Sequence, residues 1–209
     1  MKKLLICFDV DGTLIDDTTF IWQTLHDAIG TDPDEREQWA NAFWNKEITY
    51  EQWAGHDIDM WQRKGVTRQQ MMDYIDVLTP MTGSNETLSE LKNEGHDLGV
   101  ISGSLDIALA QAFPDSHQIF EHIFLNRLEF DDSGFLQRVI ATPFDIEHKA
   151  DGLVKMSELT GIPLTDTVFI GDNFNDVSVA KRAGLSLAFN CKSDELASVS
   201  DYVIQGKDL

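Results

Sequence analysis

The feature that most constrains this 209-residue chain is a short apolar run that ends in two closely spaced aspartates. Leu4-Leu5-Ile6-Cys7-Phe8 has the length and composition of a buried parallel strand, and Asp9-Val10-Asp11-Gly12-Thr13 follows it directly. Residues two apart in extended backbone point to the same side, so Asp9 and Asp11 can face one small volume. Two carboxylates at that spacing need a cation or a shared proton. The pattern indicates a metal-bound nucleophile beside an acid/base, or, more simply, an acidic turn at a strand end.

Alternating strand and helix patterns after residue 80 predict a parallel sheet with helices on both faces. Segment 16–79 has helical patterns throughout. We therefore predict a doubly wound α/β core formed by residues 1–15 and 80–209, with a helical lobe, residues 16–79, inserted after the first strand. The core strands are expected at 97–101, 119–125, 167–170, 186–189 and 202–204, the helices at 85–93, about 104–113, 148–160 and about 175–183, and a hairpin turn at 130–136.

All five tryptophans of the chain lie in the inserted lobe. Their spacing favours a packing role at the centre of a small helical bundle for most of them. One or two could instead line a substrate pocket. The five are Trp22, Trp39, Trp44, Trp53 and Trp61.

The net charge of −20, from 36 acidic and 16 basic residues, argues against nucleic acid and anionic membranes as partners. A site for a phosphorylated substrate in such a chain needs local positive charge from a metal, a lysine or helix N-termini. The two cysteines, Cys7 and Cys191, lack metal-ligand spacing and are expected to be reduced thiols. No stretch is long and apolar enough to span a bilayer, so we expect a cytoplasmic protein.

Three predicted strands end in polar turns, at Asp9–Thr13, Ser102–Ser104 and Asp172–Asp176. Ligands of open α/β sheets bind just outside the carboxyl ends of the strands, where such turns gather. Helices that start near Ser104 and Asn175 would direct free N–H groups into the same crevice, which favours an anion such as phosphate.

The carboxylates of Asp9, Asp11 and Asp172 would meet at one point, where hard oxygen ligands select Mg²⁺. Lys149, at the start of a predicted helix, could supply the positive charge or be an ordinary solvated lysine. Ser102 could bind phosphate or only cap a helix. Asp176 could belong to the site or only favour its own helix dipole.

Taken in order, these motifs resemble the haloacid dehalogenase (HAD) superfamily. Asp9–Thr13 matches its first motif, Ser102-Gly103 its second, Lys149 its third and Gly171–Asp176 its fourth. The stretches Thr79–Gly83, Ala188–Asn190 and Asp201–Ile204 are similar to the phosphoserine phosphatase branch, which uses a helical insertion as a cap. The resemblance implies a Rossmann-like HAD core with residues 16–79 as that cap.

The resemblance also implies a mechanism. Asp9 would attack phosphorus and form an aspartyl-phosphate, and Asp11 would act as the general acid and then the general base. Mg²⁺ would be held by Asp9, Asp172 and the backbone carbonyl of Asp11.

Further residues are implied to bind and orient the phosphoryl group. Ser102, the Gly103 amide and Lys149 would hold its oxygens, and Asp176 would orient Lys149. Asn175 is a candidate phosphate contact. Thr13 adds a hydroxyl and an amide N–H to the first motif.

The sequence departs from the phosphoserine phosphatase pattern at the positions that grip the amino acid. By an ungapped reading, the glutamate after the first motif falls on Thr18 and the cap arginine on Asp57. Thr18 cannot pair an ammonium strongly, and Asp57 would repel a carboxylate. Gly12 also stands where that branch usually has serine. We therefore expect a substrate other than phosphoserine, with an amine-bearing or aromatic leaving group.

The resulting prediction is a Mg²⁺-dependent phosphomonoester hydrolase of a small phosphorylated metabolite, present as a monomer or homodimer. One alternative is phosphotransfer to a second alcohol, as in a phosphomutase, which Asp11 would serve equally well. Another is a non-catalytic phosphate- or metal-binding regulator, which would have no need of an acid/base at Asp11.

Overall fold

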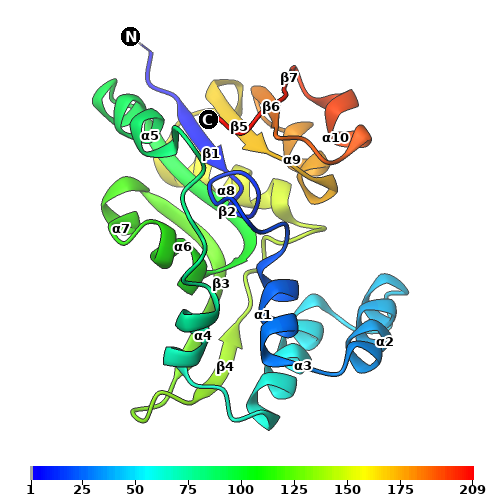
Figure 1. Cartoon of the computed structure of the whole chain (residues 1–209). Helices are drawn as coiled ribbons and strands as arrows, with labels where there is room; N and C mark the ends of the chain where they lie inside the picture. Colours follow the sequence, from blue (N-terminus) through cyan, green and yellow to red (C-terminus); the bar gives the residue numbers. More distant parts are fainter. Residues whose placement is uncertain (1) are drawn as a thin grey trace.

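The computed structural model describes residues 2–209, which contain a seven-stranded sheet in the order β4-β3-β2-β1-β5-β6-β7 (Figure 1). Six strands are parallel, and only the edge strand β4 runs antiparallel, paired with β3. This is the doubly wound α/β architecture that the alternating pattern predicts. The strands are β1 (Leu5–Phe8), β2 (Asp97–Leu105), β3 (His122–Phe130), β4 (Leu136–Ile140), β5 (Thr167–Gly171), β6 (Leu185–Phe189) and β7 (Tyr202–Ile204).

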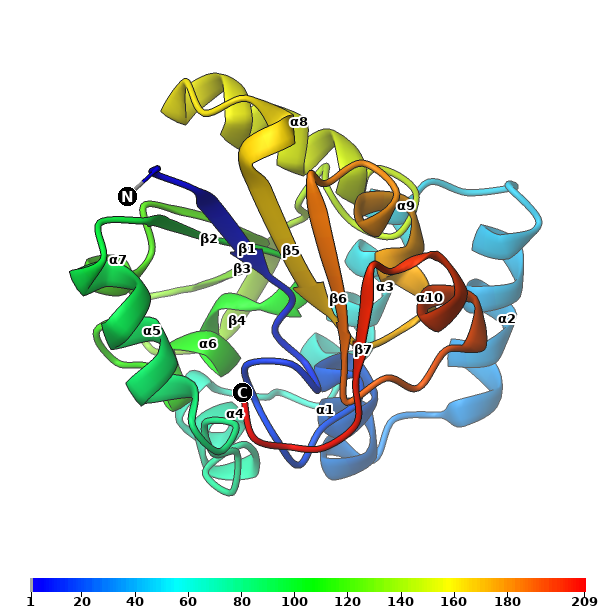
Figure 2. The same cartoon turned by 90° about the horizontal axis from the view of Figure 1, so that it is seen from above.

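Helices cover both faces of the sheet, so its central strands are buried on two sides. All four residues of β1 are buried; Leu5 and Cys7 pack with α8, whereas Ile6 and Phe8 belong to the larger core on the opposite face. Figure 2 shows α5 and α7 on one side of the sheet and α8 on the other. These core helices are α5 (Ser84–Asn93), α6 (Asp106–Ala112), α7 (Ser116–Ile119), α8 (Lys149–Thr160), α9 (Val177–Ala180) and α10 (Asp194–Val199).

The first four of the five helices between β1 and β2 lie in the lower part of the molecule in Figure 1: α1 (Ile21–Ile29), α2 (Pro33–Trp44), α3 (Tyr50–Arg63) and α4 (Arg68–Tyr74). Capping residues next to these helices set where the helices begin and end. Asp32 caps α2, while Thr49 and Thr67 form capping boxes at the starts of α3 and α4. Gly30 ends α1 in the left-handed conformation. Residues 16–79 remain our proposed boundary for the cap.

The β3–β4 hairpin reaches from the core to the cap helices. Gln62 of α3 donates from Nε2 to the carbonyl oxygens of Leu136 and Gln137, at 3.0 and 2.6 Å. The Arg68 N–H donates to the Gly134 carbonyl at 2.8 Å. Cap and core are therefore joined at the hairpin as well as through the chain connections.

Three elements differ from the sequence-based prediction. β2 continues through the Ser102–Leu105 segment as strand, so the next helix starts at Asp106 and Ser102 is not a helix cap. β3 spans 122–130 because its pairing extends to the hairpin, whereas Ile119 ends α7. The helix expected at 175–183 is only four residues long and follows a 3₁₀ turn, Phe174–Asp176.

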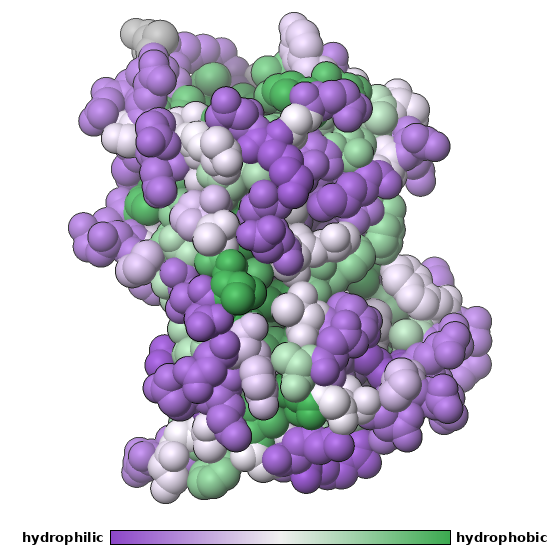
Figure 3. All heavy atoms as spheres, in the orientation of Figure 1, coloured by the Kyte–Doolittle hydropathy of each residue, from purple (hydrophilic) through white to green (hydrophobic). Residues whose placement is uncertain are grey.

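Hydrophilic side chains cover most of the face shown in Figure 3, consistent with the acidic composition. None of the helices within residues 2–209 combines the length and the apolar character needed to cross a membrane.

Candidate active site

The parallel register places the predicted motifs at one edge of the sheet. β1 lies between β2 and β5, and the Asp9 N–H donates to the Ile170 carbonyl at 2.9 Å where the two strands end. Asp9 and Asp172 thus follow neighbouring strands at their carboxyl ends. Ser102 and Gly103 lie on the other neighbour, β2. Three distant parts of the sequence therefore meet at this edge.

Lys149 is a fully buried lysine held between two carboxylates. Its Nζ donates to Asp9 Oδ1 at 2.6 Å and to Asp176 Oδ1 at 2.5 Å, and its side chain is 0% exposed. Burial alone would lower the pKa of Lys149, but the charges of Asp176 and Asp9 outweigh it and raise that pKa. Lys149 is therefore a fixed positive charge beside the predicted nucleophile.

A cluster of three buried carboxylates is suited to a divalent cation. Oxygens of Asp9, Asp172 and Asp176 lie within 4.8 Å of one another. Burial, followed by the charges of Asp9 and Asp176, raises the pKa of Asp172 to about 8. Among residues 2–209, Asp9 Oδ2 and Asp172 Oδ1 accept no hydrogen bond. These hard oxygen donors, close together and incompletely paired, fit Mg²⁺.

Asp172 is also paired with Lys192, from the loop after β6. Lys192 Nζ donates to Asp172 Oδ2 at 2.7 Å, and its backbone N–H donates to the Asp172 carbonyl at the same distance. Gly12 makes room for this pair because its φ is 79° and an added Cβ would lie 2.4 Å from both Lys192 Nζ and Asp172 Oδ2. A serine, which the phosphoserine phosphatase branch usually has at this position, would have to displace the ends of these two side chains.

Asp11 is not part of the carboxylate cluster and is held by two donors. Its Oδ1 accepts from the Ser104 hydroxyl and its Oδ2 from the Ile21 N–H, each at 2.7 Å. Burial raises the pKa of Asp11 to about 7, against the opposing effect of these hydrogen bonds. A carboxyl group with that pKa can donate and accept a proton near neutrality, as an acid/base requires.

The strand after Ser102 has a glycine at a crowded position. A Cβ on Gly103 would lie 2.4 Å from the Asp145 carboxylate, so any other residue there would require the Asp145 side chain to move. The Gly103 carbonyl accepts from Asn126 Nδ2 at 2.7 Å and from Trp22 Nε1 at 2.8 Å. These contacts fix the backbone that is predicted to bind the phosphoryl group.

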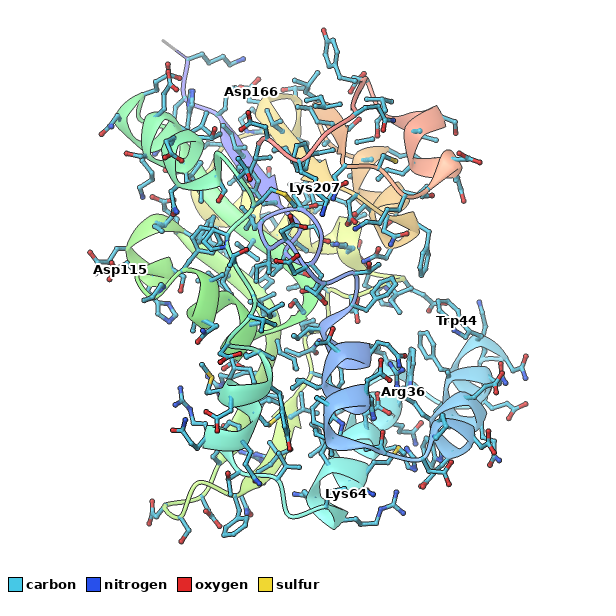
Figure 4. All side chains as sticks on the ribbon, in the orientation of Figure 1. Arg36, Trp44, Lys64, Asp115, Asp166 and Lys207 are labelled. Carbon is cyan, nitrogen blue, oxygen red and sulfur yellow. The ribbon has the colours of Figure 1, made fainter. Side chains whose placement is uncertain are left out.

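One cavity of about 280 Å³ connects the strand ends to the cap. Its core side includes the Asp9, Asp11 and Asp172 carboxylates. The cap side carries Arg36 and Asp57; Figure 4 shows Arg36 between α1 and α2, and Trp44 at the end of α2 nearer the core. Aromatic residues form much of the wall: Phe20, Trp22, Trp44, Tyr50, Trp53 and Phe174.

The matching family model is that of the haloacid dehalogenase-like hydrolases, over residues 4–184. The chain belongs to this family. It is 32% identical to a phosphoserine phosphatase of Methanocaldococcus jannaschii over 208 residues, which cover 100% of the chain and 95% of that relative. It is 30% identical to a phosphoserine phosphatase of Streptomyces coelicolor, covering 90% of the chain but 44% of that protein.

Solved structures give the same assignment. A substrate-bound phosphoserine phosphatase aligns with a TM-score of 0.77 at 30% identity, covering 100% of this chain and 95% of the other. A phospho-aspartyl intermediate analogue of phosphoserine phosphatase aligns with a TM-score of 0.76, also at 30% identity, over 100% and 96% of the two chains. This HAD hydrolase is therefore a phosphatase similar to phosphoserine phosphatases.

Not every predicted site residue of this HAD phosphatase reaches the cavity. Ser102, Gly103, Asn175 and Asp57 line it. Thr13 is fully buried beneath the site, and Thr18 pairs with Thr24 through their hydroxyls at 3.0 Å. Neither threonine lines the cavity, whereas Thr19, the neighbour of Thr18, does.

The tryptophans divide between the two roles that the sequence left open. Trp61 is fully buried, and Trp39 stacks on His56 at 3.9 Å between ring centroids. Trp22, Trp44 and Trp53 line the cavity, which is one more than the sequence led us to expect.

Several contacts of the HAD motifs were not predicted. Ser104 was expected at the start of a helix, and only the extended backbone of β2 places it on the same side as Ser102. Lys192 follows a predicted strand end, which is a weak signal. Asp145 and Arg36 have no local signal, since a loop and a cap helix bring them to the site.

Proposed function

We propose that this HAD phosphatase hydrolyses a small phosphorylated metabolite through a phosphoaspartate on Asp9, with Mg²⁺ as cofactor. The observation that carries the proposal is the arrangement around Lys149. One buried cation contacts both Asp9 and Asp176, while Asp11, two residues from the nucleophile, is held separately by Ser104 and Ile21. An acidic turn with only a structural role would not need one aspartate paired with a buried lysine and the other held by separate donors.

In the first step the Asp9 carboxylate attacks phosphorus, an Asp9–phosphorus bond forms, and the bond from phosphorus to the ester oxygen breaks. Asp11 gives its proton to the departing oxygen, so the leaving group departs as an alcohol. Lys149 holds the Asp9 carboxylate in place through its ion pair. Ser102 and the Gly103 amide are proposed to hold the phosphoryl oxygens as negative charge develops on them.

In the second step a water attacks phosphorus and gives its proton to the Asp11 carboxylate. The Asp9–phosphorus bond breaks, inorganic phosphate leaves, and the Asp9 carboxylate is restored. Asp9, Asp172 and the Asp11 carbonyl would hold Mg²⁺, which supplies positive charge between the nucleophile and the phosphoryl group. Asp176 keeps Lys149 oriented through both steps.

We further propose that the substrate is not phosphoserine, although the relatives named above are phosphoserine phosphatases. The support is the buried Asp57 in the cap wall, which would repel a substrate carboxylate. A reducing, cytoplasmic location is proposed because Cys7 and Cys191 are both free. A monomer or homodimer remains our proposal for the assembly.

The test is phosphate release from 4-nitrophenyl phosphate by the purified protein. We expect activity with Mg²⁺, loss of activity with EDTA, and recovery when Mg²⁺ is restored in excess. Asp9→Asn should abolish turnover while the melting temperature shows that the protein still folds. Full activity of Asp9→Asn would contradict the covalent mechanism, and activity unaffected by EDTA would contradict the metal requirement.

A further inference from the structure

The cap wall contains a buried carboxylate with an unused oxygen. Asp57 of α3 is 3% exposed and lines the cavity. Its Oδ1 is inaccessible to bulk solvent and has no hydrogen-bond partner among residues 2–209. Its Oδ2 lies 3.3 Å from His26 Nε2. A buried acceptor without a donor is costly, and Asp57 belongs to the wall of the cavity that a leaving group would fill.

His26 does not cancel the charge of Asp57. Trp61 Nε1 can only donate, and it donates to His26 Nδ1 at 3.2 Å, so the neutral ring carries its proton on Nε2. Burial lowers the pKa of His26, which favours this neutral form, although Asp57 opposes the effect. His26 Nε2 therefore lies beside Asp57 Oδ2, and its neutral ring places no cation next to the carboxylate.

Arg36 is the nearby cation, but its guanidinium contacts Gln23 and not Asp57. Its Nη1 donates to Gln23 Oε1 of α1, and within the described chain no ion pair joins it to Asp57. Burial lowers the pKa of Arg36, while the charges of both Asp57 and Asp27 raise it. Both carboxylates act on the same guanidinium, so Arg36 is not dedicated to Asp57.

Aromatic rings complete the surroundings of Asp57. Trp22, Tyr50 and Trp53 line the same cavity, and Trp44 and Phe174 face each other with ring centroids 6.2 Å apart. The faces of such rings attract cations, and more strongly where water is excluded. Charge and ring faces favour the same kind of ligand.

We propose that the cap half of this cavity is a subsite for a protonated amine that donates an N–H to Asp57 Oδ1, which makes the substrate a phosphomonoester of a short amino alcohol. This rests on the proposed function, since the phosphoryl group would occupy the Asp9 end of the same cavity. The unpaired acceptor requires an N–H donor, so a primary ammonium fits better than a quaternary one.

The test compares two ligands that cannot be hydrolysed and differ in one group. 2-Aminoethylphosphonate carries an ammonium where propylphosphonate carries a methyl group. Binding to the Mg²⁺-loaded protein is measured by calorimetry, with tryptophan fluorescence as a second signal because Trp22, Trp44 and Trp53 line the cavity. We expect the amine to bind about tenfold more tightly or better, as for a hydrogen bond to a charged group.

Three variants assign the preference to Asp57. Asp57→Asn should reduce the ratio of the two affinities to less than about threefold, and Asp59→Asn, an exposed residue of the same helix, should leave it unchanged. Arg36→Gln should increase the ratio, because it removes a cation that opposes the amine. Poor folding of the variant would weaken the binding of both phosphonates and could not increase the ratio of their affinities.

Equal affinities for the two phosphonates in the native protein would overturn the subsite. It would also be overturned if O-phosphoserine were hydrolysed faster than 2-aminoethyl phosphate and Arg36→Gln removed that advantage, because Arg36 would then bind a carboxylate. Hydrolysis of 4-nitrophenyl phosphate without an amine preference would contradict only the subsite. An amine preference in binding without hydrolysis of any ester would contradict only the proposed function.

Discussion

The strand-end cluster and the cap wall differ in whether their buried carboxylates have cationic partners. At the strand ends each acid has a partner: Lys149 contacts Asp9 and Asp176, and Lys192 contacts Asp172. In the cap wall, Asp57 is as deeply buried, but within residues 2–209 no lysine or arginine forms an ion pair with it. The paired cluster has its geometry set before substrate arrives, as catalysis requires. The unpaired acid is completed by a ligand. We therefore propose that the core carries the chemistry and that the cap selects the substrate.

The largest expected effect tests the core side of this comparison. Asp11→Asn should lower steady-state turnover by about 10²- to 10⁴-fold, the usual contribution of a general acid/base. With 4-nitrophenyl phosphate, whose leaving group needs little protonation, stopped-flow absorbance should show a burst of nitrophenolate equal to the enzyme concentration. Hydrolysis of the phosphoenzyme then limits the rate. If the variant lost the burst as well as turnover, formation of the phosphoenzyme would have become the slow step. That result would contradict hydrolysis of the phosphoenzyme as the step most dependent on Asp11.

Lys149→Met tests whether the pairing in the core also stabilises the fold. Removing one partner leaves Asp9 and Asp176 buried without their cation, so the free energy of unfolding should fall by about 3–5 kcal/mol. Urea denaturation in EDTA measures it. Lys155→Met is the matched control, on the same helix but with a half-exposed side chain. Its change should stay below about 1 kcal/mol. Equal losses for both variants would show that Lys149 is not a structural centre of the cluster.

Trp44→Ala tests the cap side, where substrate recognition should change and chemistry should not. Trp44 is half exposed and faces Phe174 at the cavity wall. We expect KM for 4-nitrophenyl phosphate to rise about three- to tenfold with kcat little changed, the pattern of a lost binding contact. Phe135→Ala, on the hairpin turn outside the cavity, is the control. A fall in kcat alone would place Trp44 in the chemistry of the core.

The smallest effect concerns the pH dependence of cap stability. Burial lowers the pKa of His26, so the unfolded chain binds a proton more readily than the folded one. The stability that His26 contributes is complete above its unfolded pKa of about 6.5 and is lost as pH falls below it, at up to about 1.4 kcal/mol per pH unit. Asp57, Trp61 and Thr31 face the ring, together with the more distant Arg36 and Asp27.

His26→Gln should therefore show a shallower loss of stability than the native protein between about pH 6.5 and pH 5. The measurement is the free energy of unfolding from urea curves at each pH. His117→Gln, which changes an exposed histidine of α7, should keep the native slope. An unchanged slope in His26→Gln would mean that the ring stays neutral or charged in both states.

The sequence by itself determined the local parts of this protein. The apolar run before Asp9 and the hairpin turn at 130–136 depend on residues only a few positions apart, so pattern alone located them. The order of strands and polar turns also predicted which motifs gather at the sheet edge. The same local signals misplaced the end of β2 and the length of α9, because strand pairing and 3₁₀ geometry depend on neighbours from elsewhere in the chain.

Only the tertiary structure decided which side chains complete the site. Ser104 on Asp11, Lys192 on Asp172 and Asp145 against Gly103 are contacts between residues far apart in sequence. It also placed Thr18 outside the cavity and Arg36 in its wall. The physical reason is that a cap substrate site is formed by the packing of helices against a sheet edge. Which faces meet depends on the whole set of contacts, and no window of neighbouring residues contains that information.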